Sequence, residues 1–407
     1  MRWAAAVLAA GLLTAFPLAA FPLAASAQQD TTSQENPPTT TQEPEPCLPA
    51  PPKVEPSVPW GQRQLAPERV WPLTDGTGIT VAVVDTGVDA SIPQLRGAVL
   101  PGVDTTQAGP ANTDCFGHGT FVAGIIGARA VSGTGYVGVA PGVRILPIRC
   151  ATTDDPSVAG ALTPEGMAAG IRAAVDGGAR VINVSASTTE RNAALADAVA
   201  YAEKKDVVVV ASAANSAEQG ESVTYPAAYP SVIAVGAVDE AGKHAQFSQT
   251  GQFVSLVAPG VDVVGLGPGG GGHWTGSGTS YSAPFVTGVV ALVRAYRPGL
   301  SAAEVKARLL ATASHPAVRL PDPALGWGMV DPLAAVTMEL PGEGSVVLPP
   351  DAVAAPVVVV DEVGGVVAVA GLVGGVVVVL FLGVVLRVGG RGRRRGFRAA
   401  RVVEVRE

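Results

Sequence analysis

Valine-rich apolar runs alternate with alanine-rich amphipathic stretches between about residues 60 and 338. Short continuous apolar runs predict buried strands, and apolar positions at helical spacing predict helices. The expected strands are 79–84, 181–184 and 207–211, and the expected helices are 164–176, 193–204, 284–296 and 302–313. Because strands that alternate with helices form crossover units, the sequence predicts an α/β fold with a mostly parallel sheet.

Both ends of the chain carry long apolar runs that predict membrane signals. Residues 1–27 carry a basic residue, Arg2, near their start, continue as an apolar run and end in Ala25-Ser26-Ala27, a pattern typical of a cleaved signal peptide. Residues 363–386 are 24 positions without a charge, which as a helix would cover about 36 Å against a bilayer core of about 30 Å. A buried valine-rich strand is the alternative for this second run, but its length and flanking charges favour one C-terminal transmembrane helix.

Charge sets the expected orientation. The net charge of -7 argues against a nucleic-acid-binding protein. Residues 387–407 nevertheless hold eight Arg and two Glu, directly after the predicted membrane helix. By the positive-inside rule this tail is cytoplasmic, and residues 28–362 lie outside the cytoplasm. We therefore expect a single-pass protein of the cell membrane that contacts the lipid bilayer.

The remaining boundaries follow from composition, because a segment rich in Gln, Thr, Pro and Glu precedes the alternating region and a linker rich in Pro, Gly and acidic residues follows it. The expected organisation is a signal peptide (1–27), a proline-rich extension (28–73), a folded domain (74–337), a linker (338–362), the transmembrane helix (363–386) and a basic tail (387–407).

Three cysteines remain after signal removal: Cys47, Cys115 and Cys150. In an oxidising compartment three cysteines predict one disulfide and one cysteine left over. A structural zinc site is not supported, because the chain has no Cys-x-x-Cys pair and no Cys/His cluster. No acidic loop has the spacing of calcium ligands, so we expect neither a metal nor another cofactor.

Three polar residues stand in distinctive local contexts. Asp85 follows the first expected strand, at the edge where α/β sheets collect catalytic groups. His118 lies between two glycines, which allow close backbone approach, whereas the other three histidines have no such context. Ser280 lies just after Gly278, at an expected helix start where backbone N–H groups can point at its hydroxyl. Taken singly, each is better explained as a turn residue, a structural histidine or an N-cap.

Together, the three residues fit one chemistry. A serine nucleophile needs a base to take its proton, and that base needs a carboxylate to fix its tautomer and stabilise the imidazolium. Asp85, His118 and Ser280 occur in the same order as the triad of the subtilisin-like serine proteases. The segments around them, 81–89, 117–124 and 276–284, resemble the three active-site motifs of that family. The resemblance covers about residues 74–337 and implies a three-layer subtilisin-like fold with these residues as the catalytic triad.

The resemblance also implies roles for two further segments. Asn215 matches the asparagine whose side-chain amide completes the oxyanion hole in that family, although Ala214 stands where the family has glycine. Ser185, Ala186 and Ser187 match the segment that pairs with the substrate backbone by strand addition, although the glycines that usually follow it are missing.

Other features resemble the mycosins, the membrane-anchored subtilisin-like proteases of type VII secretion systems in actinobacteria. These features are Pro59-Trp60, residues 65–73, Asp114-Cys115, and the order of signal, extension, protease, linker, membrane span and basic tail. The resemblance implies that Cys47 and Cys115 form a disulfide that ties the extension near His118. Cys150 then remains as a buried free thiol.

Two function classes stay open. The first is a serine endopeptidase that cleaves protein substrates secreted through the type VII pathway. The second is a structural component that stabilises the type VII secretion membrane complex. The triad favours catalysis, whereas the sequence says nothing about assembly.

Overall fold

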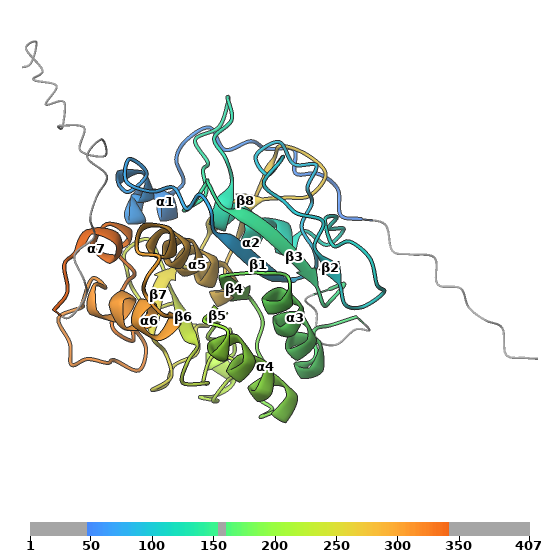
Figure 1. The fold of residues 1–407 in the computed structure, drawn as a ribbon. Helices are drawn as coiled ribbons and strands as arrows, with labels where there is room; N and C mark the ends of the chain where they lie inside the picture. Colours follow the sequence, from blue (N-terminus) through green and yellow to red (C-terminus); the bar gives the residue numbers. More distant parts are fainter. Residues whose placement is uncertain (1–46, 154–159, 342–407) are drawn as a thin grey trace, which may run out of the picture. The chain divides into compact units, whose positions relative to one another are not determined.

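Seven strands form the central sheet of the computed structural model, which describes residues 47–153 and 160–341 (Figure 1). The strand order is β2-β3-β1-β4-β5-β6-β7, and every neighbouring pair is parallel. The strands are β1 (Thr80–Asp85), β2 (Val103–Asp104), β3 (Arg144–Arg149), β4 (Val181–Val184), β5 (Val208–Ser212), β6 (Ile233–Val238) and β7 (Leu256–Pro259). A separate antiparallel pair joins β8 (Val263–Leu266) to β9 (His273–Gly276). The predicted α/β fold with a mostly parallel sheet is confirmed.

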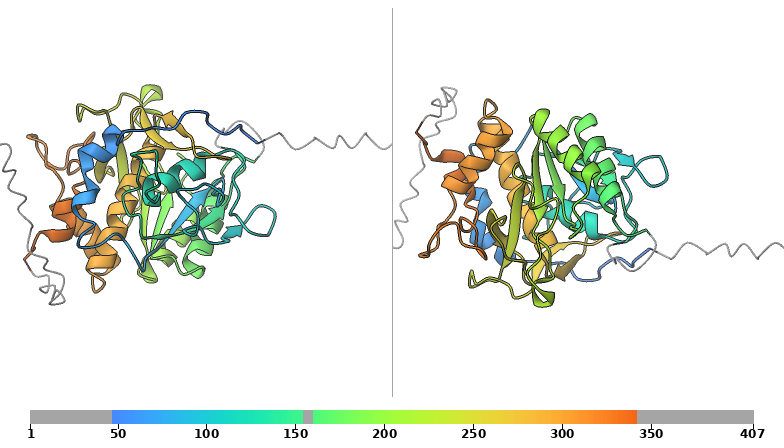
Figure 2. Two further views of the ribbon diagram at one scale, coloured as in Figure 1. Left: turned by 90° about the horizontal axis from the view of Figure 1, so that it is seen from above. Right: turned by 90° about the horizontal axis from the view of Figure 1, so that it is seen from below.

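Helices cover both faces of the sheet. The described helices are α1 (Trp60–Leu65), α2 (His118–Gly127), α3 (Pro164–Asp176), α4 (Ala193–Lys204), α5 (Thr279–Tyr296), α6 (Ala302–Ala311) and α7 (Pro332–Thr337). Alternate residues of β1 point to opposite faces, as in any strand. Val81 and Val83 therefore join one core cluster with α2 and α5, whereas Ala82 and Val84 join a second with α3 and α4. Helix, sheet and helix form the three expected layers, which Figure 2 shows from two further sides.

The strand order creates a crevice at the carboxyl edge of the sheet. Strand β1 pairs with β3 on one side and β4 on the other. The helix that follows β1 packs on one face of the sheet, and the helix that follows β4 packs on the opposite face. Open α/β sheets bind ligands where neighbouring connections diverge in this way. Because Val84 pairs with Val184, Asp85 and Ser185 leave the adjacent strands side by side at this crevice.

Most of the elements expected from the sequence are present with small shifts. The expected bounds of α3, α4 and β4 are those observed, and β1 and β5 begin and end one residue later. The helix expected at 302–313 ends at Ala311, where the Thr312 hydroxyl donates to the Arg308 carbonyl oxygen and closes the last turn. The sequence analysis missed the strands of the sheet beyond β5, the hairpin β8–β9, and strands β2 and β3.

The prediction that a helix begins at residue 284 is wrong. Helix α5 begins at Thr279, so Pro284 lies inside it rather than at its first position. A proline within a helix removes one backbone hydrogen bond, because it has no N–H to donate to the residue four before it. That residue is Ser280, whose carbonyl oxygen instead accepts a hydrogen bond from the Ser185 hydroxyl at 2.7 Å.

Only part of the membrane and extension predictions falls on the described residues. The signal peptide, the first part of the extension, nearly all of the linker, the transmembrane helix (363–386) and the basic tail lie outside them. Across residues 47–153 and 160–341, no helix combines the length and the apolar composition that a membrane span requires.

The predicted disulfide between Cys47 and Cys115 is confirmed, and Cys150 is a buried free thiol. The segment that follows Cys47 packs along the domain. The Leu48 N–H donates to the Cys115 carbonyl oxygen at 2.9 Å, and the His273 N–H donates to the Lys53 carbonyl oxygen at 2.7 Å. This part of the extension is thus fastened beside the start of α2 by a covalent bond and by main-chain hydrogen bonds.

We expect the Cys47→Ala/Cys115→Ala variant to lose about 4 kcal/mol of unfolding free energy, because the disulfide closes a loop of 68 residues in the unfolded chain. Denaturant titration measures this loss. Cys150→Ala is the matched control, because it removes a buried thiol without opening a loop, and it should cost about 1 kcal/mol. Equal losses in the two variants would contradict a stabilising role for the crosslink.

Candidate active site

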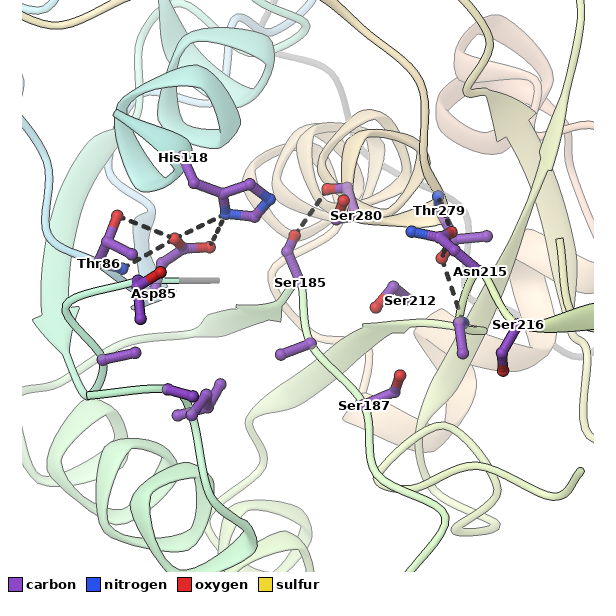
Figure 3. A pocket seen from close by; sticks show the side chains of 16 residues that line it. Asp85, Thr86, His118, Ser185, Ser187, Ser212, Asn215, Ser216, Thr279 and Ser280 are labelled. Carbon is purple, nitrogen blue, oxygen red and sulfur yellow. Dashed lines mark hydrogen bonds and ion pairs between the residues drawn. The ribbon is translucent and has the colours of Figure 1, made fainter. Parts of the chain in front are cut away.

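A pocket of about 400 Å³ opens at the carboxyl edge of the sheet (Figure 3). The ends of β1, β4 and β5 and the first turns of α2 and α5 line it. The pocket contains all seven residues that the sequence analysis assigned to catalysis or substrate binding: Asp85, His118, Ser185, Ala186, Ser187, Asn215 and Ser280. None of the other three histidines lines the pocket, and His273 instead accepts a hydrogen bond from the Glu55 N–H.

Asp85 and His118 form a close buried pair. Asp85 is the last residue of β1, and His118 is the first residue of α2. The His118 Nδ1 lies 2.8 Å from Oδ1 and 3.0 Å from Oδ2 of Asp85. A carboxylate at this distance fixes the tautomer with the proton on Nδ1, which leaves Nε2 as the acceptor. In Figure 3 the imidazole lies between Asp85 and Ser280.

The start of α2 packs directly on the end of β1. A Cβ at Gly119 would lie 2.0 Å from the Gly87 carbonyl oxygen and 3.1 Å from the Asp85 Cβ. Only a glycine fits a backbone approach this close. The glycine after the histidine therefore sets the short distance between the two side chains.

Asp114 supplies a second carboxylate, which connects the turn after Asp85 to the start of α2. The first N–H groups of a helix have no partners within the helix. In α2 the Gly119 N–H donates to the Thr86 hydroxyl at 3.1 Å, and the Thr120 N–H donates to Asp114 Oδ2 at 2.9 Å. Thr86 also donates to Asp114 Oδ1 at 3.0 Å, which joins the turn after Asp85 to the start of α2. Burial raises the pKa of the Asp114 carboxyl, and its hydrogen bonds oppose that shift.

Ser280 and Asn215 face each other across Gly278. A Cβ on Gly278 would lie 3.0 Å from the Ser280 Oγ and 3.2 Å from the Asn215 Nδ2, so both atoms border the same space. The Asn215 Oδ1 accepts hydrogen bonds from both the N–H and the hydroxyl of Thr279, each at 2.8 Å. Because these bonds fix the amide, its Nδ2 donor is the end that faces the pocket. The Ser280 N–H, in the first turn of α5, is a second donor beside it.

The departure at Ala214 has a structural consequence. Its φ is +93°, a left-handed conformation in which glycine has no steric penalty and alanine does. The Ala214 N–H donates to the Thr279 hydroxyl at 3.2 Å, which helps to hold this backbone in place. The chain therefore holds local strain directly beside Asn215, as is common near functional sites.

The segment Ser185-Ala186-Ser187 lines the pocket between β4 and the end of β5. The Ser185 hydroxyl does not face the space that a substrate would occupy, because it donates to the Ser280 carbonyl oxygen. This segment can thus offer its backbone to an extended peptide, while the Ser185 side chain is engaged within the protein.

Sequence reasoning assigned no role in the site to Thr86, Asp114 or Thr279. Asp114 carried a signal, because an acidic residue just before a helix start can accept that helix's unpaired N–H groups. Thr86 and Thr279 carried none, because Thr86 bonds to Asp114 and Thr279 to Asn215, which lie 28 and 64 residues away in the chain.

Comparison with known proteins gives consistent matches. Residues 76–328 match the subtilase family. The chain is 38% identical to mycosin-4 of Mycobacterium tuberculosis over 331 residues, which cover 71% of this chain and 72% of that protein. It is 36% identical to mycosin-3 of the same organism, over 75% of this chain and 78% of the relative. The solved structure of the MycP3 protease from the type VII (ESX-3) secretion system matches with a TM-score of 0.63 and 34% identity, over 72% of this chain and 93% of that one.

Proposed function

Because the chain belongs to the subtilase family of serine proteases and is related to the mycosins, we propose that Asp85, His118 and Ser280 are its catalytic triad. The observation that supports this most strongly is the pair of short contacts between His118 Nδ1 and Asp85, in the pocket that also holds Ser280.

In the proposed reaction the Ser280 Oγ attacks the carbonyl carbon of a peptide bond, and His118 Nε2 takes the hydroxyl proton. The tetrahedral oxyanion accepts hydrogen bonds from the Ser280 N–H and the Asn215 Nδ2. A single such donor is worth about 2.7–4 kcal/mol to the transition state. His118 then gives its proton to the leaving amine, and Asp85 stabilises the imidazolium in between. A water molecule then attacks the acyl carbon in the same way, with His118 again as base and acid, and releases the acyl group from Ser280.

Substrate binding in this proposal uses main-chain contacts. The backbone of residues 185–187 follows strand β4 along the pocket, and an extended peptide can pair with it as an additional strand. The substrate is therefore a protein segment that can adopt an extended conformation. The kinship with mycosins supports secreted proteins of a type VII system as the source of that segment.

We further propose that the protease domain lies outside the cytoplasm and is anchored by residues 363–386. The uncharged run and the arginine-rich residues 387–407 support this orientation. Protease added to spheroplasts should then digest an epitope within residues 47–341 and spare one on the tail. Digestion of the tail alone would refute the orientation.

A structural role in the secretion membrane complex is the second candidate function, supported by the similarity to MycP3, a protease from the type VII (ESX-3) secretion system. We expect Ser280→Ala to abolish substrate cleavage while the complex stays assembled, because the substitution removes one hydroxyl from a folded domain. A deletion of the whole chain separates the two functions. If the deletion disrupts the complex and Ser280→Ala does not, the protein has both functions.

The endopeptidase proposal would fail if the secreted substrate were processed normally in cells that carry Ser280→Ala. The measurement is the size of the secreted protein on a gel, with the membrane complex isolated from the same cells. An intact complex in the deletion strain would remove the structural candidate.

A further inference from the structure

Asn183 is a buried amide in the middle of β4, a strand whose other members are Val and Ile. A buried amide without partners is costly, so its hydrogen bonds need an explanation. The Asn183 Nδ2 donates to the Ser185 hydroxyl at 2.8 Å, and its Oδ1 accepts from the Thr287 hydroxyl at 2.8 Å. The proposed catalytic steps use none of these three side chains.

The chain of hydrogen bonds ends on the main chain of Ser280. The Ser185 hydroxyl has one proton, and one of its lone pairs already accepts from Asn183. Its proton therefore points to the Ser280 carbonyl oxygen, 2.7 Å away, a contact drawn in Figure 3. Thr287 fixes the orientation of the amide, and the amide fixes the orientation of the hydroxyl.

The reason for this arrangement is the proline in α5. In a regular helix the Ser280 carbonyl oxygen would accept from the N–H of the residue four positions on, and Pro284 has no N–H. The first turn of α5, which carries the Oγ and the N–H of Ser280, would lack a bond that normally holds such a turn. The Ser185 hydroxyl supplies the missing donor from another strand.

We propose that Ser185 is a positioning residue that holds the Ser280 peptide in place of the absent N–H of Pro284, with Asn183 and Thr287 orienting its hydroxyl. This inference rests on the proposed role of Ser280 as the nucleophile. It assigns the side chain of Ser185 to the geometry of the nucleophile and leaves only its backbone for substrate pairing.

A double-mutant cycle tests whether the Ser185 hydroxyl replaces the backbone N–H that Pro284 lacks. Ser185→Ala should lower kcat for a peptide substrate about tenfold with KM changed less than about twofold, because the lost bond positions the nucleophile and does not bind substrate. Pro284→Ala alone should stay within about threefold of wild type. The Ser185→Ala/Pro284→Ala protein should recover to the level of Pro284→Ala, because residue 284 then donates its own N–H to Ser280. Losses that multiply in the double variant would overturn the proposal.

Thr287→Val gives a second test that does not depend on Pro284. It should lower kcat about threefold in the wild type and have no further effect in Ser185→Ala, because Thr287 acts through Ser185. The matched control is Thr312→Val, which removes another buried threonine hydroxyl, one that donates to the Arg308 carbonyl oxygen. We expect this control to leave kcat unchanged. An equal loss in the control would show that the effect is general destabilisation.

The same cycle, measured by denaturant unfolding in a Ser280→Ala background, separates this inference from the proposed function. In that background, adding Pro284→Ala to Ser185→Ala should restore the unfolding free energy that Ser185→Ala removes. This recovery would show the hydrogen bond to the Ser280 carbonyl oxygen even if Ser280 is not the nucleophile. If the wild type hydrolyses peptide but Pro284→Ala restores neither kcat nor the unfolding free energy of Ser185→Ala, the positioning role is refuted and the proposed function stays intact.

Discussion

Replacing Ser280 with alanine is expected to lower kcat for peptide hydrolysis by about 10⁶-fold, the loss that follows removal of an activated serine from a triad. The protein should fold as before, because the hydroxyl faces the pocket and Gly278 keeps the space beside it open. Single-turnover assays on the purified domain measure the remaining rate, with thermal unfolding as the control for folding. Hydrolysis within tenfold of wild type by a folded Ser280→Ala protein would remove Ser280 as the nucleophile.

The Asp85→Asn variant is expected to lose about 10⁴-fold in kcat, the second-largest effect that we predict. The asparagine amide would donate to His118 Nδ1 across the present 2.8 Å contact, so the imidazole proton would move to Nε2. That tautomer cannot accept the proton of Ser280. KM should change little, because Asp85 lies behind the histidine and would not touch the substrate.

Non-additivity provides the control for this second prediction. Residues that act as one catalytic unit do not contribute independent factors to the rate. The Asp85→Asn/Ser280→Ala protein should therefore hydrolyse peptide about as slowly as Ser280→Ala alone. A further large loss in the double variant would show that Asp85 acts separately from the nucleophile.

The residues that the sequence located best are those with a local reason for their identity. Asp85 ends an apolar run, His118 is the first residue of a helix that follows a glycine, and Ser280 is the second residue of another such helix. In a parallel sheet the carboxyl ends of the strands meet at one edge, so the topology brings these separate motifs together. Three motifs that are separate in the sequence therefore lie in one pocket, at the crevice between β1 and β4.

The support of the site could not be predicted in the same way. Asn183 and Thr287 are 104 residues apart, and neither stands in a pattern that points to the other. Ser185 was expected to pair with the substrate by strand addition, and no pattern in the sequence indicated that its hydroxyl turns toward Ser280. The position of Pro284 inside α5 explains this orientation, and it also explains why the start of that helix was placed five residues too late.

Strand β3 illustrates why some strands of the sheet were missed. It contains Pro147, and a proline within an apolar run argues against a strand in the sequence. The structure tolerates it because β3 lies close to the edge of the sheet, with β2 paired only to Ile148 and Arg149. Tertiary position overrides the local signal there.

Covalent labelling of the active protein with a fluorophosphonate tests the central claim most directly. An activated serine reacts with such a reagent only while its base is intact. We predict one adduct for each active molecule, located on Ser280 by peptide mapping, and no adduct in His118→Ala. An adduct on a different residue, or full peptide hydrolysis by protein that carries no adduct, would contradict the assignment of the triad.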